Sequence, residues 1–441
     1  MEKAKQILVE KKYLLTFILI TSLFALWGFA NDITNPMVAA FQTVMELSAT
    51  KASLVQFAFY GGYATMALPA ALFVRKYSYK KGILLGLALY AIGAFLFIPA
   101  AEYQEFSFFC ISLYVLTFGL AFLETTSNPY ILSLGTPETA TRRLNLAQSF
   151  NPIGSLCGMF VASNVVLSSL QSDSAEVREI GFSMLDEATK ASIRLHDLGV
   201  IRNPYVILGC VVLLMFVVIA LFVKSGNDTK VEKAEEPKVK DSLRRLWNNK
   251  CYRYGVLTQV FYVATQIMCW TFIIQYGTSI LMEEGMTEQA AEVTSQQYNI
   301  YAMILFIISR FICTYLMKWL NPGLMLLIFG TLAIILTCGV ISMHNHYGLY
   351  CLVGVSGCMS LMFPTIYGIA LEGLGDDAKF GAAGLIMAIL GGSVLPPLQA
   401  SIIDMGTVFG MPAVNASFIL PLICFLVVAI YGRRMWKTRT A

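Results

Sequence analysis

The chain has 441 residues, of which 57% are hydrophobic and 13% are charged, and its mean hydropathy is +0.67. Soluble chains average about 25% charged residues, so this composition excludes an ordinary soluble domain and indicates an all-α membrane protein with many spans. The net charge of +4 is too small to indicate a nucleic-acid partner.

Apolar runs long enough to cross a bilayer predict twelve transmembrane helices. Their approximate limits are 13–41, 50–75, 82–100, 106–134, 143–169, 204–223, 252–282, 292–318, 323–343, 346–373, 380–403 and 414–435. The first run is too long for a signal peptide and has no small-residue cleavage site, so we expect it to remain as the first span.

Lys and Arg are distributed unevenly between the two sides of the predicted membrane. Of the 31, 25 fall on the side of the two termini, five fall on the other side, and Arg310 lies within a span. The positive-inside rule therefore places both termini in the cytoplasm, as in a multi-pass protein of a bacterial inner (plasma) membrane.

A polar stretch near the middle divides the chain. Residues 224–249 are rich in Lys and Glu and have no apolar period, which predicts a cytoplasmic linker with one surface helix. The predicted parts are an N-terminal six-helix half at 1–223, this linker, and a C-terminal six-helix half at 250–441. We expect short amphipathic helices, of no assigned role, in the external segment 170–203.

Two G-x-x-x-G pairs, Gly82 with Gly86 and Gly154 with Gly158, indicate close packing between helices. Close helix contact while the helices rock against one another is the alternative interpretation of these pairs.

Glu124 is the most informative residue, because it lies well inside an apolar run. A carboxyl group in the hydrocarbon interior costs roughly 2.5–3.5 kcal/mol and indicates a function. A buried carboxyl group can bind and release a proton. Asn128 follows four residues later and shares its helix face. In the next span, Asn145, Gln148 and Asn151 recur every three residues, and such amides suit a ligand rich in hydroxyl groups.

The first span carries a second acid, Asp32, between Asn31 and Asn35. We expect Asp32 to titrate or to bind ligand, although an acid near a membrane end can also simply contact water. Pro36 frees a backbone carbonyl in this span and is expected to bend the helix.

The seventh span carries a stripe of amides and aromatic rings on one helix face: Gln259, Tyr262, Gln266 and Trp270. Amides can bind the hydroxyl edges of a sugar, and a ring can cover its apolar C–H face. Packing is the other interpretation of such a stripe. Arg310, in the eighth span, either neutralises an acid, moves with a gate, or ties helices together.

Several classes of function lack support in the sequence. No P-loop, Walker motif or catalytic nucleophile is present, so we expect neither an enzyme nor an ATP-driven pump. The ten cysteines mostly lie in apolar runs without CxxC spacing, so no metal site is predicted. We expect no cofactor beyond a co-transported proton, and a monomer whose partners are a monosaccharide, the proton and membrane lipid.

Two six-helix halves with a basic loop between the second and third spans and a long central linker are typical of the major facilitator fold. The chain also resembles the L-fucose–proton symporter branch of the major facilitator superfamily, which includes glucose/galactose carriers. The resemblance rests on L-W-G-F-A-N at 26–31, Q-F-A-F-Y-G-G-Y at 56–63, L-E-T-T-S-N-P-Y at 123–130, R-L-N-L-A-Q-S-F-N at 143–151, Q-V-F-Y-V-A-T-Q-I-M-C-W at 259–270 and F-P-T-I-Y at 363–367.

The resemblance implies that Glu124 links sugar binding to proton coupling, and that Asn145, Gln148 and Asn151 line the sugar cavity together with the seventh span. One position departs from the family pattern, which has its first-span Asp where this chain has Asn35, and usually has Asn where this chain has Asp32. The predicted function is sugar–proton symport of L-fucose or a related monosaccharide. The alternative is glucose/galactose uptake, either coupled to Na⁺ or uncoupled.

Overall fold

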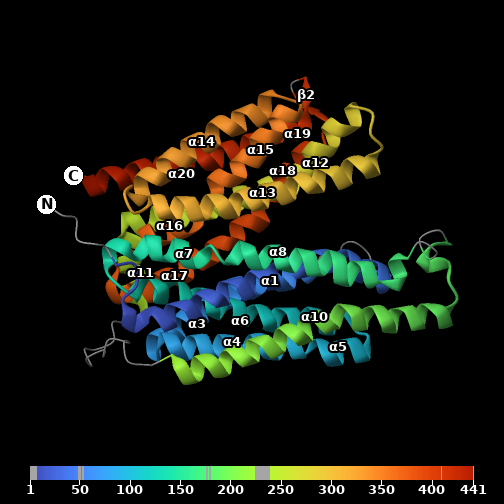
Figure 1. Ribbon diagram of the computed structural model, residues 1–441, viewed down its shortest axis with the longest axis horizontal. Helices are drawn as coiled ribbons and strands as arrows, with labels where there is room; N and C mark the ends of the chain where they lie inside the picture. Colours follow the sequence, from blue (N-terminus) through green and yellow to red (C-terminus); the bar gives the residue numbers. More distant parts are fainter. Residues whose placement is uncertain are drawn as a thin grey trace. The chain divides into compact units, whose positions relative to one another are not determined.

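The computed structural model describes residues 7–47, 51, 54–174, 177, 180–223, 239–408 and 410–440, without the side chains of 35–40, 42, 56, 57, 60, 163, 173, 183, 289, 439 and 440. Almost all of the described chain is helical (Figure 1). The predicted side chain of Asn35 therefore lies outside the described set.

Long helices form the N-terminal half. They are α1 (Leu14–Val44), α3 (Leu54–Lys76), α4 (Tyr79–Phe95), α5 (Phe97–Tyr103), α6 (Phe106–Ser133), α7 (Ala140–Gln148), α8 (Asn151–Val161) and α10 (Glu187–Phe222). Short 3₁₀ or π turns occur at Lys11–Tyr13, Pro137–Thr139, Ala162–Val166, Leu167–Ser169, Gln171–Asp173 and Phe182–Met184.

A surface helix, α11 (Val239–Asn248), precedes the helices of the C-terminal half. These are α12 (Lys250–Glu283), α13 (Glu288–Leu316), α14 (Pro322–Ser342), α15 (His346–Met359), α16 (Met362–Leu371), α17 (Ala378–Met387), α18 (Gly391–Ile403), α19 (Ala413–Ser417) and α20 (Ile419–Thr440). Two 3₁₀ turns at Gly375–Asp377 and Ala388–Leu390 flank α17, and two-residue strands β1 (Thr407–Val408) and β2 (Met411–Pro412) pair antiparallel.

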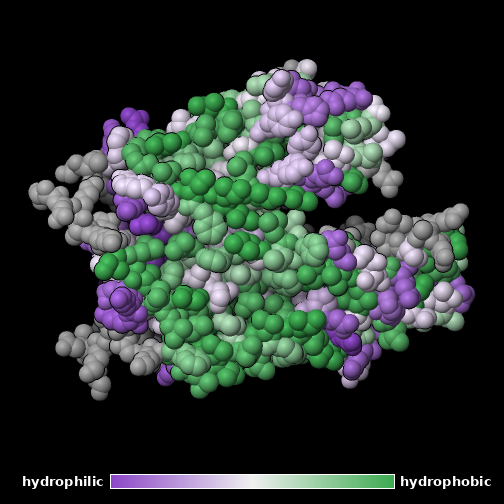
Figure 2. Space-filling view, viewed as in Figure 1, coloured by the Kyte–Doolittle hydropathy of each residue, from purple (hydrophilic) through white to green (hydrophobic). Residues whose placement is uncertain are grey.

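The membrane-spanning character of these helices agrees with the twelve predicted spans. Among the described residues, eleven helical segments are long and apolar enough to cross a bilayer, and α3 corresponds to the remaining predicted span. Apolar residues cover the lengths of the helices and hydrophilic residues gather toward their ends (Figure 2).

The helix of the sixth span differs from its prediction. It begins at Glu187 rather than near residue 204, so half of the external segment continues the membrane helix. The Asp186 side chain caps the first turn by accepting a hydrogen bond from the Thr189 backbone N–H. The bonds from Thr189 lower the pKa of the Asp186 carboxyl.

The buried Asp197 contacts the start of the external segment. It accepts hydrogen bonds of 2.9 Å from the backbone N–H groups of Gln171 and Ser172. Before α10, Gln171–Asp173 and Phe182–Met184 form 3₁₀ turns, and Val177 and Ile180 are helical. Residues 175, 176, 178 and 179 lie outside the described set, so the short amphipathic helices expected here stay a prediction.

Contacts divide the chain into two compact units. The N-terminal unit comprises Lys11–Tyr130 and Phe150–Glu236, and the C-terminal unit comprises Met1–Glu10, Ile131–Ser149 and Pro237–Ala441. In the N-terminal unit α1 packs on α8, and α10 packs on α4 and α5. In the C-terminal unit α12 packs on α13, α15, α16, α18 and α20, while α7 packs on α16 and α13.

Arg143 fixes the turn that leads into α7. It is fully buried and donates to the backbone carbonyls of Ile131 and Leu132, at the end of α6, and to that of Leu8. The last carbonyls of a helix have no donors within that helix, and a buried guanidinium with five N–H groups can satisfy several at once.

Candidate functional site

Glu124 lies in α6 of the N-terminal unit, with only 8% of its surface exposed. The Tyr63 hydroxyl, on α3, donates a hydrogen bond of 3.0 Å to its carboxylate. Within the described part of the chain, no cationic side chain pairs with Glu124. A carboxyl group that is buried, held by one neutral donor and free of a counter-charge is suited to gain and lose a proton.

Asn128 lies one turn beyond Glu124 and is fully buried. Its Nδ2 donates to the backbone carbonyl of Glu124 at 2.9 Å. The two residues therefore share one helix face, as their spacing predicts, and the amide braces the backbone that carries the acid.

Asp32 is half-buried in α1, where the Ser155 hydroxyl of α8 hydrogen-bonds to its carboxyl group. The neighbouring Asn31 has a buried Oδ1 for which the described residues provide no donor. Asp32 therefore contacts the protein through Ser155, and its role stays a prediction.

Helices α1 and α8 pass very close to one another beside Asp32. A Cβ added to Gly154 would lie 1.9 Å from the Ala25 carbonyl oxygen, and one added to Gly28 would lie 2.1 Å from that of Asn151. The Asn151 Nδ2 also donates to the Phe24 carbonyl at 3.2 Å. The backbone contact brings Ser155 within reach of Asp32 and uses part of the Asn151 amide for packing.

Asn145 and Gln148 lie on α7, in the C-terminal unit. Asn145 is fully buried, and its Nδ2 donates to Thr365 Oγ1 of α16 at 3.1 Å. Its Oδ1 has no hydrogen-bond donor among the described residues. Gln148 is also buried, and Asn151 belongs to the other unit, so the periodic triplet is divided between the units.

The aromatic members of the α12 stripe contact protein. The Tyr262 hydroxyl donates to the Met359 carbonyl at 3.0 Å, and Trp270 Nε1 donates to Ser356 Oγ at 2.9 Å. The Trp270 ring packs edge-on against Phe306 at a centroid distance of 5.0 Å. These contacts fit the packing interpretation of the two rings.

The two amides of the stripe differ from the rings. Gln259 is fully buried, and neither of its amide atoms has a hydrogen-bond partner among the described residues. Gln266 is half-buried. Gln259 is therefore the residue of the stripe with the most unused hydrogen-bonding capacity.

Arg310, on α13, is 4% exposed. Its Nη1 donates to the Gln148 carbonyl at 2.9 Å, its Nε donates to the Ser360 carbonyl, and its guanidinium lies 4.6 Å from the Phe306 ring centroid. No acid pairs with it among the described residues. The contacts support the interpretation that Arg310 ties helices together.

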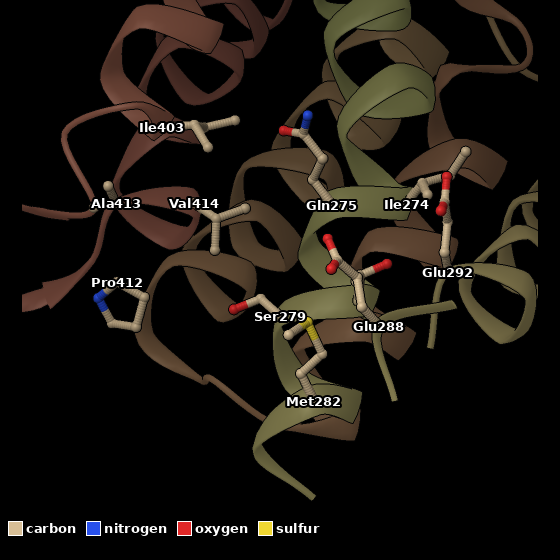
Figure 3. Close-up of a pocket in the computed structure, with 12 residues that line it drawn as sticks. Ile274, Gln275, Ser279, Met282, Glu288, Glu292, Ile403, Pro412, Ala413 and Val414 are labelled. Carbon is tan, nitrogen blue, oxygen red and sulfur yellow. The ribbon is translucent and has the colours of Figure 1, made fainter. Parts of the chain in front are cut away.

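A cavity of about 550 Å³ lies in the C-terminal unit, between the end of α12, the start of α13 and the segment from α18 to α19. Gln275, Ser279 and Glu288 are among the residues that line it (Figure 3). None of the predicted sugar or proton residues lines this cavity, so it contributes nothing to the candidate site.

The structure thus groups the predicted residues in two sets. The N-terminal unit carries Asn31, Asp32, Glu124, Asn128 and Asn151, and the C-terminal unit carries Asn145, Gln148, Gln259, Tyr262, Gln266, Trp270 and Arg310. Sequence reasoning missed Tyr63, Ser155 and Thr365, which hydrogen-bond to three of these residues. Tyr63 and Thr365 lie in two of the segments that carry the resemblance, at 56–63 and 363–367, and this position in the sequence could have identified them.

Comparison with known proteins settles the family. Residues 15–397 match the Major Facilitator Superfamily. The chain belongs to this superfamily. It is 60% identical over 430 residues to the L-fucose-proton symporter of Haemophilus influenzae, covering 97% of this chain and 98% of that one. It is 29% identical over 424 residues to a glucose/galactose transporter of Brucella abortus, covering 96% and 94%.

A solved structure of a fucose symporter has the same fold as this chain. This facilitator superfamily member matches a crystal structure of the Escherichia coli fucose:proton symporter with a TM-score of 0.84 at 32% identity, covering 96% of this chain and 99% of that one. The fold prediction and the resemblance to the fucose symporter branch are confirmed, and the superfamily is one of transporters. The comparisons do not test the roles of individual residues, which stay predictions.

Proposed function

We propose that this chain is a sugar–proton symporter that carries L-fucose, or a closely related monosaccharide, into the cell by alternating access of its two halves. The relative at 60% identity is an L-fucose-proton symporter, whereas the glucose/galactose transporter is only 29% identical. This difference favours L-fucose as the substrate. The distribution of Lys and Arg supports an inner-membrane protein with both termini in the cytoplasm.

The observation that carries the proposal is the environment of Glu124. It is a buried acid inside a membrane helix, held by the Tyr63 hydroxyl and without a cationic partner among the described residues. A protonated carboxyl group passes through a closed, water-free state at lower cost than an unpaired carboxylate. Reorientation is therefore favoured when both proton and sugar are bound, and Asp32 is the second acid that can share this role.

Unused amide groups support the sugar-binding part of the proposal. Asn31 Oδ1, Asn145 Oδ1 and both amide atoms of Gln259 are buried without partners among the described residues. A buried polar atom that lacks a partner costs about 1–3 kcal/mol, and sugar hydroxyl groups can both donate to and accept from amides.

The test is pH recording in lightly buffered proteoliposomes with single sugars added in turn. We expect L-fucose to alkalinise the medium with the wild-type protein. Glu124→Gln should lose this response and the accumulation of sugar against its gradient, while retaining sugar exchange. Glu138→Gln is the matched control, because Glu138 is an exposed carboxyl group on the turn just after α6.

The other possible results would contradict different parts of the proposal. Accumulation by Glu124→Gln would refute its coupling role. A response to glucose or galactose alone would change the substrate, and uptake without a pH change would favour Na⁺ coupling or facilitated diffusion.

A further inference from the structure

Two prolines, Pro152 in the fifth span and Pro364 in the tenth, leave backbone carbonyls without helical donors. Proline has no N–H, so the carbonyl four residues before it loses its usual partner. For Pro152 that carbonyl belongs to Gln148, and for Pro364 it belongs to Ser360. The structure interrupts both helices at these points, between α7 and α8 and between α15 and α16.

Arg310 donates to both of these carbonyls. Its Nη1 lies 2.9 Å from the Gln148 oxygen, and its Nε donates to the Ser360 oxygen. Ser360 and Gln148 lie on different helices, and both helices pack on α13, which carries Arg310. One guanidinium thus replaces two amide donors that the prolines removed.

The charge of Arg310 has no acid to neutralise it among the described residues, and its other contact is the face of the Phe306 ring. A cation inside the bilayer is costly unless its donors are satisfied. Two carbonyl oxygens accept hydrogen bonds from the Arg310 guanidinium, and the Phe306 ring covers one side of it. These contacts join the two interrupted helices to α13.

The predicted sugar residues lie at the same two interruptions. Gln148 is the last residue of α7, and Asn145 stands one turn before it. Asn145 Nδ2 donates to Oγ1 of Thr365, the residue that follows Pro364 in α16. The positions of the Asn145 and Gln148 amides therefore depend on how the two interrupted helices are held against one another.

We propose that Arg310 is a positioning residue for sugar recognition, which acts through the backbone of Gln148 and the Asn145–Thr365 contact rather than by touching the sugar. This inference rests on the proposed function. Arginine suits the role because its planar fork offers separate donors to two carbonyls, whereas lysine offers one compact ammonium group.

The experiment measures the L-fucose dissociation constant and the transport KM and maximal rate of purified variants, together with their unfolding temperatures. We expect Arg310→Met to weaken L-fucose binding at least tenfold, and Arg310→Lys to weaken it less. Arg142→Met is the matched control. Arg142 lies on α7 and donates to the Thr314 carbonyl of α13 at 3.2 Å, but Thr314 does not precede a proline by four residues. Its removal should leave the dissociation constant within twofold of wild type.

A rescue tests the carbonyl assignment directly. Pro152→Ala together with Pro364→Ala returns an N–H to each interruption, so adding both to Arg310→Met should recover most of the lost affinity. Failure of this rescue in a folded protein would overturn the assignment. If Arg310→Met does not fold, Arg310→Lys with and without the alanine changes provides the same comparison.

The outcomes separate the inference from the function on which it rests. If the wild type binds no monosaccharide, the proposed function is wrong. If the wild type binds L-fucose and Arg310→Met binds it equally well, with only a lower unfolding temperature, Arg310 is merely structural and the inference fails.

Discussion

The close contact of α1 with α8 can be tested by adding a single methyl group at Gly154. In Gly154→Ala the new Cβ would lie 1.9 Å from the Ala25 carbonyl oxygen and 2.7 Å from its carbon. Both atoms belong to the backbone, so no side chain can rotate away. The helices would have to separate by about 1.5 Å to reach the 3.4 Å at which ordinary van der Waals contact begins.

The cost of this separation can be bounded. Overpacking costs about 1–3 kcal/mol, and a backbone clash of this size belongs at the upper end. The better helix propensity of alanine offsets about 1 kcal/mol of that. We therefore expect a net loss of about 2 kcal/mol, together with weaker sugar binding, because Ser155 moves away from Asp32.

The assay is thermal unfolding of purified protein in detergent, combined with sugar binding. Gly199→Ala is the control, since a Cβ there meets nothing within 4 Å and the change should stabilise α10 slightly. Gly158→Ala should have an intermediate effect, because its Cβ would lie 2.6 Å from the Phe29 carbonyl oxygen. A Gly154→Ala protein that unfolds at the wild-type temperature and binds sugar normally would refute the reasoning.

Two further predictions follow from individual contacts. Tyr63→Phe removes the hydroxyl that donates to Glu124. Because a hydrogen bond to a charged group contributes about 1.5–3 kcal/mol, proton-driven accumulation should fall roughly tenfold or more while sugar exchange persists. Unchanged accumulation in pH recordings would contradict a role for this bond. Asp197→Asn removes one of the two carboxylate oxygens that accept from the backbone N–H groups of Gln171 and Ser172. Limited proteolysis should then cut the 170–186 segment faster than in wild type, with transport unaffected. Equal cleavage rates would show that Asp197 does not hold this segment.

The spans were predictable because burial in a bilayer requires a continuous apolar run. The fourth predicted span, 106–134, matches α6 at Phe106–Ser133. The sixth span was misjudged at its start, since hydropathy locates the membrane and not the end of a helix. Nothing in residues 187–203 ends α10, and Pro204 is tolerated inside it.

The candidate site was predictable only in part. Glu124 and Arg310 were visible as charges in apolar runs, because their cost in a bilayer does not depend on the fold. Their partners were not visible, since Tyr63 is one of many aromatic residues in its helix and a backbone carbonyl has no sequence signature. The prolines at 152 and 364 mark the carbonyls that Arg310 binds, but only the packing of α7 and α15 on α13 brings them to one guanidinium.

Two kinds of buried polar group in the membrane helices can be distinguished on physical grounds. Arg143 and Arg310 direct their donors at carbonyls near helix ends or interruptions, where the backbone itself lacks partners. Among the described residues, six buried amide atoms of Asn and Gln have no partner, and four of them belong to the predicted sugar residues Asn31, Asn145 and Gln259. A satisfied cation holds helices in place, whereas an unsatisfied amide lowers stability unless a ligand completes it. In the proposed function, sugar hydroxyl groups complete these amides, so the same groups that weaken the empty protein would provide selectivity for a sugar.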